Sequence, residues 1–267
     1  MHSLSLVRRG KGPAKAGRVR YNEANMPKLA LENPDNKVNI LGVGVTSTEL
    51  AEVLTKIDQT CLPAGRFAKS SLKKTFFIVT VNQEFVMLAQ DDPEFKDILN
   101  QADLALADGF GLKLAKADLQ IVPGRKLVES LLHRNLKMFY LGGQDGVAEQ
   151  MAEKFGGGFD LGETDVSHPT RNAEILKKIN VFEPDVLLVA YGAPWQEKWI
   201  WANKDQIQTK VVMGVGGAFD YLTGRAKMPP EWVNKWGLEW LWRLLHEPWR
   251  WRRQLALLRF VWRLWSS

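Results

Sequence analysis

Cysteine and histidine are scarce in this sequence. The 267 residues include one cysteine, Cys61, and four histidines that lack the spacing of metal ligands. A lone cysteine excludes an intramolecular disulfide and a zinc site built from several cysteines, and it suits a reducing compartment. We expect Cys61 to be an ordinary buried or unpaired thiol.

Long hydrophobic runs are also missing. No window reaches 18 uninterrupted apolar residues, and the charged N-terminus lacks the apolar segment of a secretory signal. We therefore expect a cytoplasmic protein that does not span a membrane. Hydrophobic residues still make up 45% of the chain, which is enough for the core of one large domain with extensions.

The common nucleotide-binding fingerprints are absent. Residues 41–47 lack the third glycine of a dinucleotide-binding loop, residues 142–146 have the wrong spacing for one, and no P-loop ending in Gly-Lys-Ser or Gly-Lys-Thr is present. A dehydrogenase or a P-loop NTPase is therefore disfavoured. No Asp-x-Asp pair is present to hold a divalent ion under a nucleotide diphosphate. A transferase built on this sequence would hold its leaving diphosphate with cationic side chains, and we expect no metal cofactor.

The net charge of +6 is concentrated at the two ends of the chain. Residues 1–36 carry seven Lys or Arg against three acidic residues, and residues 232–267 carry seven against two. We predict a basic, disordered tail over 1–36, an α/β catalytic domain over 37–228 and a helical appendage over 229–267. Basic ends favour an anionic surface, which nucleic acid or a lipid headgroup layer could supply.

Short apolar segments alternate with amphipathic ones from residue 37 onward. β-Branched and aromatic runs predict strands at Val38–Val43, Thr75–Val81, Lys137–Leu141, Asp185–Ala190 and Lys210–Val215. Apolar spacing predicts helices at Ser47–Lys56, Glu84–Gln90, Glu94–Asn100, Leu127–Leu132, Val147–Phe155, Asn172–Asn180 and Gln196–Gln206. This alternation predicts an α/β fold with a mostly parallel sheet and helices on both faces.

Several predicted strands end in turn-forming residues, at Val81-Asn82, Gly142-Gly143, Gly192–Pro194 and Gly214–Gly217. In open α/β sheets, ligands bind outside the carboxyl ends of the strands, and glycine there lets backbone N–H groups approach a phosphate. These ends indicate a phosphate-bearing or nucleotide ligand. The alternative is that the glycines only make tight turns between strand and helix.

Polar side chains at two strand ends are candidates for chemistry. Asp108 follows the mostly apolar run Ala102–Ala107 and is followed by Gly109. Such a carboxylate can accept the proton of a sugar hydroxyl that attacks an anomeric carbon, or it can cap a helix over 111–116. Thr80 and Asn82 point to the same side of an earlier strand and can hydrogen-bond a sugar or a base. Asn82 could equally cap the next helix.

The segment Gly192–Trp199 combines a tight turn with a proline at a helix start. We expect Gln196 to lie in the first turn of that helix and to face a ligand-binding cleft at the carboxyl ends of the strands. Glu197 and Lys198 are more typical of a solvated helix face.

Tryptophan is concentrated in the C-terminal appendage. Eight of the eleven tryptophans lie there, and Pro248 separates a predicted helix near Leu238–His246 from a second near Trp249–Leu264. At about 100° per residue, the second helix has one apolar stripe, formed by Trp251, Leu255, Leu258, Trp262 and Trp265. A row of arginines lies beside it, formed by Arg252, Arg259 and Arg263. This pattern is typical of a helix that lies in the headgroup layer of a bilayer. The alternatives are a helical hairpin packed on the domain or on another subunit, and a surface that binds single-stranded nucleic acid.

Several ordered segments together resemble the WecG/TagA/CpsF family of bacterial glycosyltransferases across about residues 38–260. They are Thr80–Glu84, Ala107–Gly111, Gly192–Ile200, Gly214–Asp220, Gly237–Leu244 and Glu247–Arg250. The resemblance implies a Rossmann-like domain whose C-terminal appendage touches the membrane and completes the active site. It also implies an inverting, metal-independent transfer from a UDP-sugar to a sugar on undecaprenyl diphosphate at the inner leaflet. The transferred sugar would be of the N-acetylmannosamine type, glucose or a uronic acid.

The same resemblance implies roles for individual residues. Asp108 matches the proposed base. Residues that match substrate contacts in the cleft are Thr80, Asn82 and Gln196. Appendage arginines that match groups reaching the diphosphate are Arg243, Arg250 and Arg253. We expect the nucleotide end to be held by Gly142, Gly143, Gly214, Gly216 and Gly217.

The sequence departs from the family pattern in two places. Where the family usually has Arg, a turn with Gly, and then Asp, this chain has Ile121, Gly124 and Lys126, and Trp195 stands where Lys is common. The first departure indicates a different sugar or acceptor contact. The expected partners are the UDP-sugar, the polyprenyl-diphosphate-linked acceptor and an anionic membrane, with homo-oligomer formation left open. A non-catalytic sugar-nucleotide-binding protein and a nucleic-acid-binding protein are the alternatives, and the intact Asp108 segment favours the enzyme.

Overall fold

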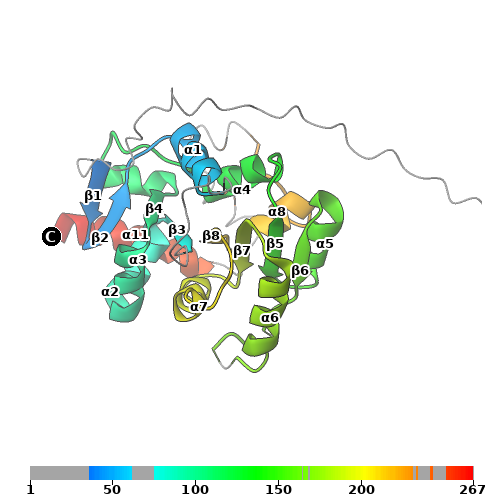
Figure 1. Cartoon of the computed structure of the whole chain (residues 1–267). Helices are drawn as coiled ribbons and strands as arrows, with labels where there is room; N and C mark the ends of the chain where they lie inside the picture. The colour runs from blue at the N-terminus through cyan, green and yellow to red at the C-terminus, as the bar shows by residue number, and fades with distance from the viewer. Residues whose placement is uncertain are drawn as a thin grey trace, which may run out of the picture.

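The computed structural model describes residues 36–61, 75–163, 165–167, 169–230, 233, 241–242 and 251–266, without the side chains of 251–255. These residues form three layers, in which one sheet separates two groups of helices (Figure 1). The tail predicted over 1–36 lies outside the described residues except for Asn36. Most of the predicted helix near Leu238–His246 lies outside them as well.

Within the described residues, eight strands form the sheet. In chain order they are β1 (Lys37–Ile40), β2 (Val43–Thr46), β3 (Phe76–Val81), β4 (Leu104–Ala107), β5 (Met138–Gly142), β6 (Gly158–Asp160), β7 (Val186–Ala190) and β8 (Val211–Gly214). Their order across the sheet is β1-β2-β4-β3-β8-β7-β5-β6, and each neighbouring pair is parallel except β1 with β2. The mostly parallel sheet predicted from the sequence is confirmed.

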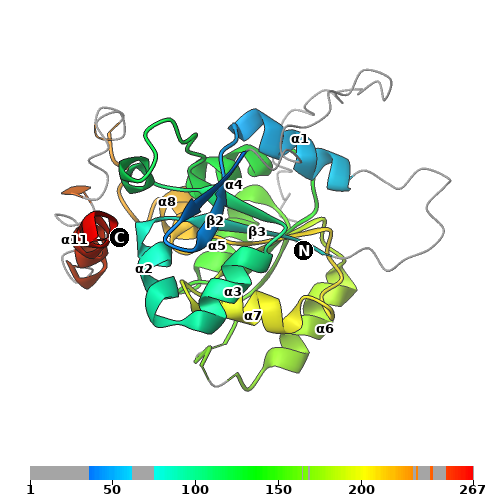
Figure 2. The same ribbon diagram turned by 90° about the vertical axis from the view of Figure 1, so that its left-hand side faces the viewer.

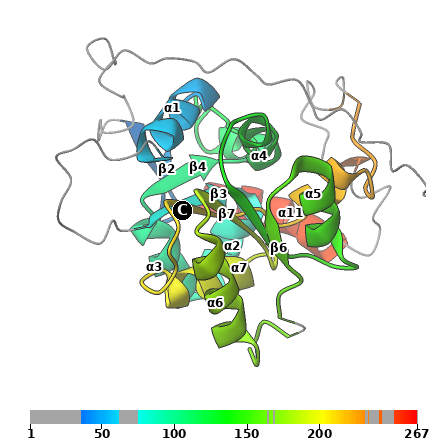
Figure 3. The ribbon, with the colours of Figure 1, turned by 45° about the vertical axis from the view of Figure 1, so that its right-hand side comes forward.

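Helices cover both faces of this sheet, as predicted. They are α1 (Leu50–Cys61), α2 (Gln83–Asp91), α3 (Pro93–Gln101), α4 (Gly124–Leu132), α5 (Val147–Phe155), α6 (Asn172–Phe182), α7 (Trp195–Asn203), α8 (Ala218–Thr223) and α11 (Trp251–Ser266), with a 3₁₀ helix η4 at Phe110–Leu114. One face carries α1, α4, α5 and α8, and the other carries α2, α3, α6 and α7 (Figures 1 and 3). The chain therefore has a Rossmann-like α/β fold.

The central strands are buried on both sides because their side chains alternate between two hydrophobic cores. In β3, Phe77 and Val79 pack in the core under α2 and α3, whereas Ile78 packs in the core under α1 and α4. Strands of this kind appear in a sequence as nearly continuous apolar runs. This explains why the apolar runs predicted the strands at the centre of the sheet.

The first predicted strand, Val38–Val43, is wrong as a single strand. The chain turns back at Leu41 and Gly42, whose φ angles of 51° and 84° suit a two-residue hairpin turn. The Gly42 N–H donates to Asn39 Oδ1 at 2.8 Å and closes this turn. As a result, β1 and β2 form an antiparallel hairpin at the edge of the sheet.

Most other predicted elements are present with shifted ends. α5 matches its predicted range, whereas α1 begins at Leu50 rather than Ser47 and continues to Cys61. The helix expected over 111–116 is the short 3₁₀ helix η4, and the sequence did not predict β6 or α8. Cys61 is a free, buried thiol, as expected, and burial raises its pKa to about 12. A thiol with so high a pKa is a poor nucleophile at neutral pH.

The C-terminal helix α11 packs along α2 at the edge of the body (Figure 2). Ala256 and Phe260 are buried in the core that α2 and α3 share. The Arg259 guanidinium adds an ion pair, because its Nη2 lies 3.0 Å from Asp91 Oδ2 at the end of α2. One face of α11 is therefore part of the body, as the packed alternative for this segment required.

A second face of α11 is apolar and exposed. Leu258, Trp262 and Trp265 are 67%, 66% and 88% exposed. These three residues belong to the apolar stripe predicted from the sequence. The structure does not describe the side chains of the other two residues of that stripe, Trp251 and Leu255. Among the described residues, no helix is long and apolar enough to cross a membrane.

Phe260→Ala should destabilise the folded body. The Phe260 side chain is fully buried, so its removal leaves a cavity and loses apolar burial, at a cost of about 3–5 kcal/mol. Urea unfolding measures this cost, with Trp262→Ala on the exposed face of α11 as the matched control, which should stay within about 0.5 kcal/mol. Equal stability of the two variants would contradict the docking of α11 on α2.

Candidate active site

A cleft of about 820 Å³ opens at the carboxyl ends of the parallel strands. Residues that follow or end β3, β4, β5, β7 and β8 line it. β4 lies on one side of β3, and β8, β7 and β5 lie on the other. The connections from β3 to β4 and from β4 to β5 therefore run in opposite directions across the sheet, which is where open α/β sheets bind their ligands. The volume is in the range of small-molecule and cofactor sites.

Asp108 follows β4 directly and lines this cleft. Its backbone N–H donates to Val81 O at 2.7 Å and continues the pairing of β4 with β3. The N-cap position of η4 is occupied by Gly109, which directly follows Asp108. Asp108 is therefore not the N-cap residue of this helix, the position that the sequence left open as an alternative.

Asp108 and Thr80 converge on the first residue of α4. A Cβ atom placed on Gly124 would lie 3.1 Å from Asp108 Oδ2 and 3.2 Å from Thr80 Oγ1. Both oxygens can approach the start of α4 because Gly124 has no side chain. The structure thus brings the candidate base and a candidate substrate-binding hydroxyl together at one wall of the cleft.

Asn82 both lines the cleft and caps α2. Its Oδ1 accepts the Phe85 N–H at 3.1 Å, so the capping alternative is present together with the cleft position. The neighbouring Gln83 also lines the cleft, and its buried Oε1 has no hydrogen-bond partner among the described residues. A Cβ atom on Gly111 would lie 2.8 Å from this oxygen, which accounts for the glycine there.

Gln196 connects two of the turns that form the cleft. Its side chain is 2% exposed, and its Oε1 accepts the Gly192 N–H at 3.1 Å and the Gly216 N–H at 2.9 Å. Gly192 follows β7 and Gly216 follows β8, so one carboxamide oxygen fixes two strand ends relative to each other. Gln196 lies in the first turn of α7 and lines the cleft, and its contact with a substrate stays a prediction.

Glu197 lies next to Gln196 and is completely buried. The expectation that it belongs to a solvated helix face is wrong. Its Oε1 accepts a hydrogen bond from Gln196 Nε2 at 2.7 Å, and its Oε2 has no partner among the described residues. Burial raises the pKa of Glu197 to about 8, against a smaller lowering by the hydrogen bond from Gln196. Lys198 is partly exposed and pairs with Asp92 at 2.8 Å.

The glycines predicted to hold a nucleotide fall into two groups. Those that line the cleft are Gly143, Gly216 and Gly217. Gly142 and Gly214 are not among the described lining residues, and their Cβ positions are occupied by other side chains. A Cβ on Gly142 would lie 2.7 Å from the Tyr191 ring, and one on Gly214 would lie 2.5 Å from Glu197 Oε1. Close packing accounts for these two glycines.

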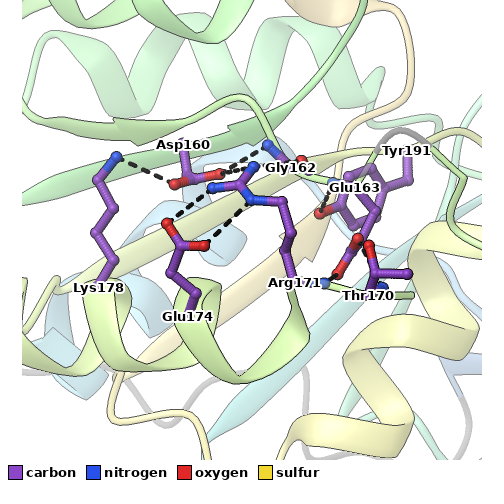
Figure 4. A network of polar contacts seen from close by, with 8 residues as sticks. All are labelled: Asp160, Gly162, Glu163, Thr170, Arg171, Glu174, Lys178 and Tyr191. Carbon is purple, nitrogen blue, oxygen red and sulfur yellow. Dashed lines mark hydrogen bonds and ion pairs between the residues drawn. The ribbon is translucent and has the colours of Figure 1, made fainter.

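A polar network holds the loop between β6 and α6 (Figure 4). Asp160 is buried and accepts a hydrogen bond from Lys178 Nζ at 3.0 Å. Glu163 accepts the backbone N–H of Arg171 at 2.8 Å, and its own N–H donates to the Tyr191 hydroxyl at 3.1 Å. Tyr191 also lines the cleft, so this network supports the cleft wall at the end of β7.

Cationic side chains of the cleft were missed as site residues by sequence reasoning. They are Lys113 on η4 and Arg125 and Lys126 in the first turn of α4. The signal for Lys113 was its position just after the Asp108 segment, and the signal for Lys126 was that it stands where the family usually has Asp. The predicted arginines Arg243 and Arg250 lie outside the described residues, as does the side chain of Arg253. In the described part of the chain, no group of three or more His, Cys, Asp or Glu is placed to hold a metal ion.

Known proteins show similarity to nearly the whole chain. The family model of the glycosyl transferase WecG/TagA/CpsF family matches residues 38–267. An N-acetylglucosaminyldiphosphoundecaprenol N-acetyl-beta-D-mannosaminyltransferase from Staphylococcus aureus (strain MRSA252) is 31% identical, over 81% of this chain and 86% of its own length. A protein of the same name from strain MW2 is 30% identical over the same shares. The matched residues include all strands that contribute to the cleft.

Glu197→Gln should remove a pH dependence of stability. The folded-state pKa of about 8 lies above the ordinary value of 4.5, so the folded protein keeps a proton that the unfolded chain loses between these values. The stability that this group contributes is fully present below about pH 4.5 and is lost as the pH rises toward 8, at about 1.4 kcal/mol per pH unit.

Urea unfolding at about pH 5.5 and about pH 7.5 tests this prediction. The Gln variant should lose less stability between the two pH values than the parent, because an amide does not titrate. Parallel losses in the two proteins would mean that Glu197 is ionised in the folded state, against its burial.

Proposed function

This chain belongs to the WecG/TagA/CpsF family and is a glycosyltransferase, and we propose that it transfers a sugar, with inversion, from a UDP-sugar to a sugar on undecaprenyl diphosphate. The staphylococcal relatives are named for the transfer of N-acetylmannosamine to N-acetylglucosaminyldiphosphoundecaprenol. N-Acetylmannosamine is therefore the first donor sugar to test here, followed by glucose and uronic acids. The proposed product feeds a cell-surface polysaccharide.

The position of Asp108 carries this proposal. Its carboxylate lies in the cleft, and its Oδ2 approaches the start of α4 beside Thr80 Oγ1. In the proposed reaction, Asp108 accepts the proton of the acceptor hydroxyl while the hydroxyl oxygen bonds to the anomeric carbon. The bond from that carbon to the diphosphate oxygen breaks on the opposite face, and UDP leaves with the electron pair. Because the hydroxyl oxygen attacks on one face of the anomeric carbon and UDP leaves from the other, the configuration of that carbon is inverted.

We place the nucleotide end of the donor against the ends of β5 and β8. Gly143, Gly216 and Gly217 line the cleft there, and backbone without side chains allows the close approach of a diphosphate. Arg125 and Lys126 line the same cleft and offer positive charge for the leaving group. The arginines predicted for this task, Arg243, Arg250 and Arg253, would add to that charge.

An acceptor with an undecaprenyl chain lies in a membrane, so we propose that α11 binds the surface of the inner leaflet. Leu258, Trp262 and Trp265 form an exposed apolar face on that helix. Tryptophan side chains suit the headgroup layer, where an apolar ring and a polar N–H both find partners. Arg263 is exposed beside this face and can attract anionic headgroups.

Asp108→Asn should lower turnover by roughly 10²–10⁴-fold and leave UDP binding intact, because the amide cannot accept the proton. Asp118→Asn is a matched control, since Asp118 is exposed and lies outside the cleft lining. Release of UDP from UDP-N-acetylmannosamine in the presence of a lipid diphosphate acceptor measures turnover. Near-parental turnover of the Asn variant would exclude Asp108 as the base. A protein that binds UDP but transfers no sugar from UDP-N-acetylmannosamine, UDP-glucose or a UDP-uronic acid would favour the non-catalytic alternative.

The triple variant Leu258→Ser/Trp262→Ser/Trp265→Ser should bind anionic vesicles at least about tenfold more weakly. The three apolar side chains that would enter the headgroup layer are missing in this variant. Turnover with a water-soluble acceptor should stay at the parental level. Vesicle flotation at low salt measures the binding, and Val181→Ser on α6, which replaces another exposed apolar side chain, is the control. Recovery of the unsubstituted protein wholly in the unbound fraction would contradict the membrane proposal.

A further inference from the structure

The 3₁₀ helix η4 exposes apolar side chains that the proposed reaction does not use. Phe110 and Leu114 are 55% and 58% exposed, and both line the cleft that holds Asp108. Leu112, which lies between them in the sequence, is fully buried and anchors η4 to the body. The two exposed side chains therefore stand on an anchored element, and gathered apolar groups in a cleft mark a binding surface.

A cation stands among these apolar groups. Residues three apart in a 3₁₀ helix lie on the same side, which places Lys113 next to Phe110. The Lys113 ammonium is 6.0 Å from the centre of the Phe110 ring. Lys113 also lines the cleft, and no carboxylate of the described residues forms an ion pair with it. Its charge is therefore available to a ligand in the cleft.

The apolar surface continues from η4 onto α11. Leu257 lines the same cleft, and a Cβ atom on Gly111 would lie 3.3 Å from Leu257 Cδ1, so the two elements are in close contact. The next residue along α11, Leu258, is exposed on the face proposed to meet the membrane. α11 thus has one leucine at the cleft wall and the next on its exposed face.

We propose that η4 binds the lipid-proximal part of the acceptor, with Lys113 at its diphosphate and Phe110, Leu114 and Leu257 along its first isoprene units. This inference rests on the proposed function, which supplies the acceptor class. A lipid-linked sugar carries its sugar, its diphosphate and its apolar chain in that order. Asp108, Phe110, Lys113 and Leu114 all belong to the short segment 108–114 and line one cleft, so the base, the cation and the apolar contacts are close together.

Farnesyl diphosphate and inorganic diphosphate are suitable probes, because they share the charged group and differ in the isoprenoid chain. Calorimetric titration of the full chain, with saturating UDP to fill the donor site, should give a Kd for farnesyl diphosphate at least about tenfold below that for inorganic diphosphate. The double variant Phe110→Ser/Leu114→Ser should raise the farnesyl diphosphate Kd about tenfold and leave the inorganic diphosphate Kd unchanged. Lys113→Gln should weaken both ligands by the same factor.

Val181→Ser is the control, because Val181 is 77% exposed on α6 and lies outside the cleft lining. It should change neither Kd. Equal weakening of the two probes by the double variant, or no effect on farnesyl diphosphate, would overturn the isoprenoid subsite. Selective binding of farnesyl diphosphate in a protein that transfers no sugar would instead overturn the proposed function and leave the subsite standing.

Discussion

The cleft depends on the buried carboxamide of Gln196. Its Oε1 accepts the N–H groups of Gly192 and Gly216, which belong to the turns after β7 and β8. A buried donor left without an acceptor costs about 1–3 kcal/mol, so the loss of this oxygen would release both turns at once. Glu197 Oε1 holds the other end of the carboxamide at 2.7 Å. The shape of one cleft wall is thus set by two side chains of the first turn of α7.

This arrangement explains glycines that would otherwise suggest phosphate-binding loops. Gly214 leaves room for Gln196 and Glu197, and Gly142 leaves room for the Tyr191 ring. Gly124 differs from these two, because Gly124 itself lines the cleft, and the atoms that approach it are Asp108 Oδ2 and Thr80 Oγ1. Glycine at a strand end therefore has at least two causes here. Only the three-dimensional structure shows which glycines make room for a packed side chain and which line the cleft.

The sequence predicted what depends on local pattern. Buried parallel strands such as β3 and β7 were found because they are continuous apolar runs, and α5 was found because its apolar positions repeat with the helical period. The turn at Leu41 and Gly42 was missed, because one positive φ there belongs to a leucine, and such turns favour Asn, Asp or Gly. The burial of Glu197 could not be read locally, since it depends on β8 packing against α7. The same holds for Lys113 and Arg125, which reach the cleft only through the placement of η4 and α4.

The two interpretations of the C-terminal helix are compatible, because α11 is apolar on two faces. Phe260 and Trp262 are two residues apart, about 200° around the helix, so a body that buries the first leaves the second exposed. α11 packs along α2, which begins after the cleft residue Asn82, and Leu257 of α11 lines the cleft itself. The direction of the exposed face is therefore fixed relative to Asp108. In the proposed function, a membrane bound to that face would lie near η4 and its apolar contacts, and the proposed lipid-linked acceptor would enter the cleft from there.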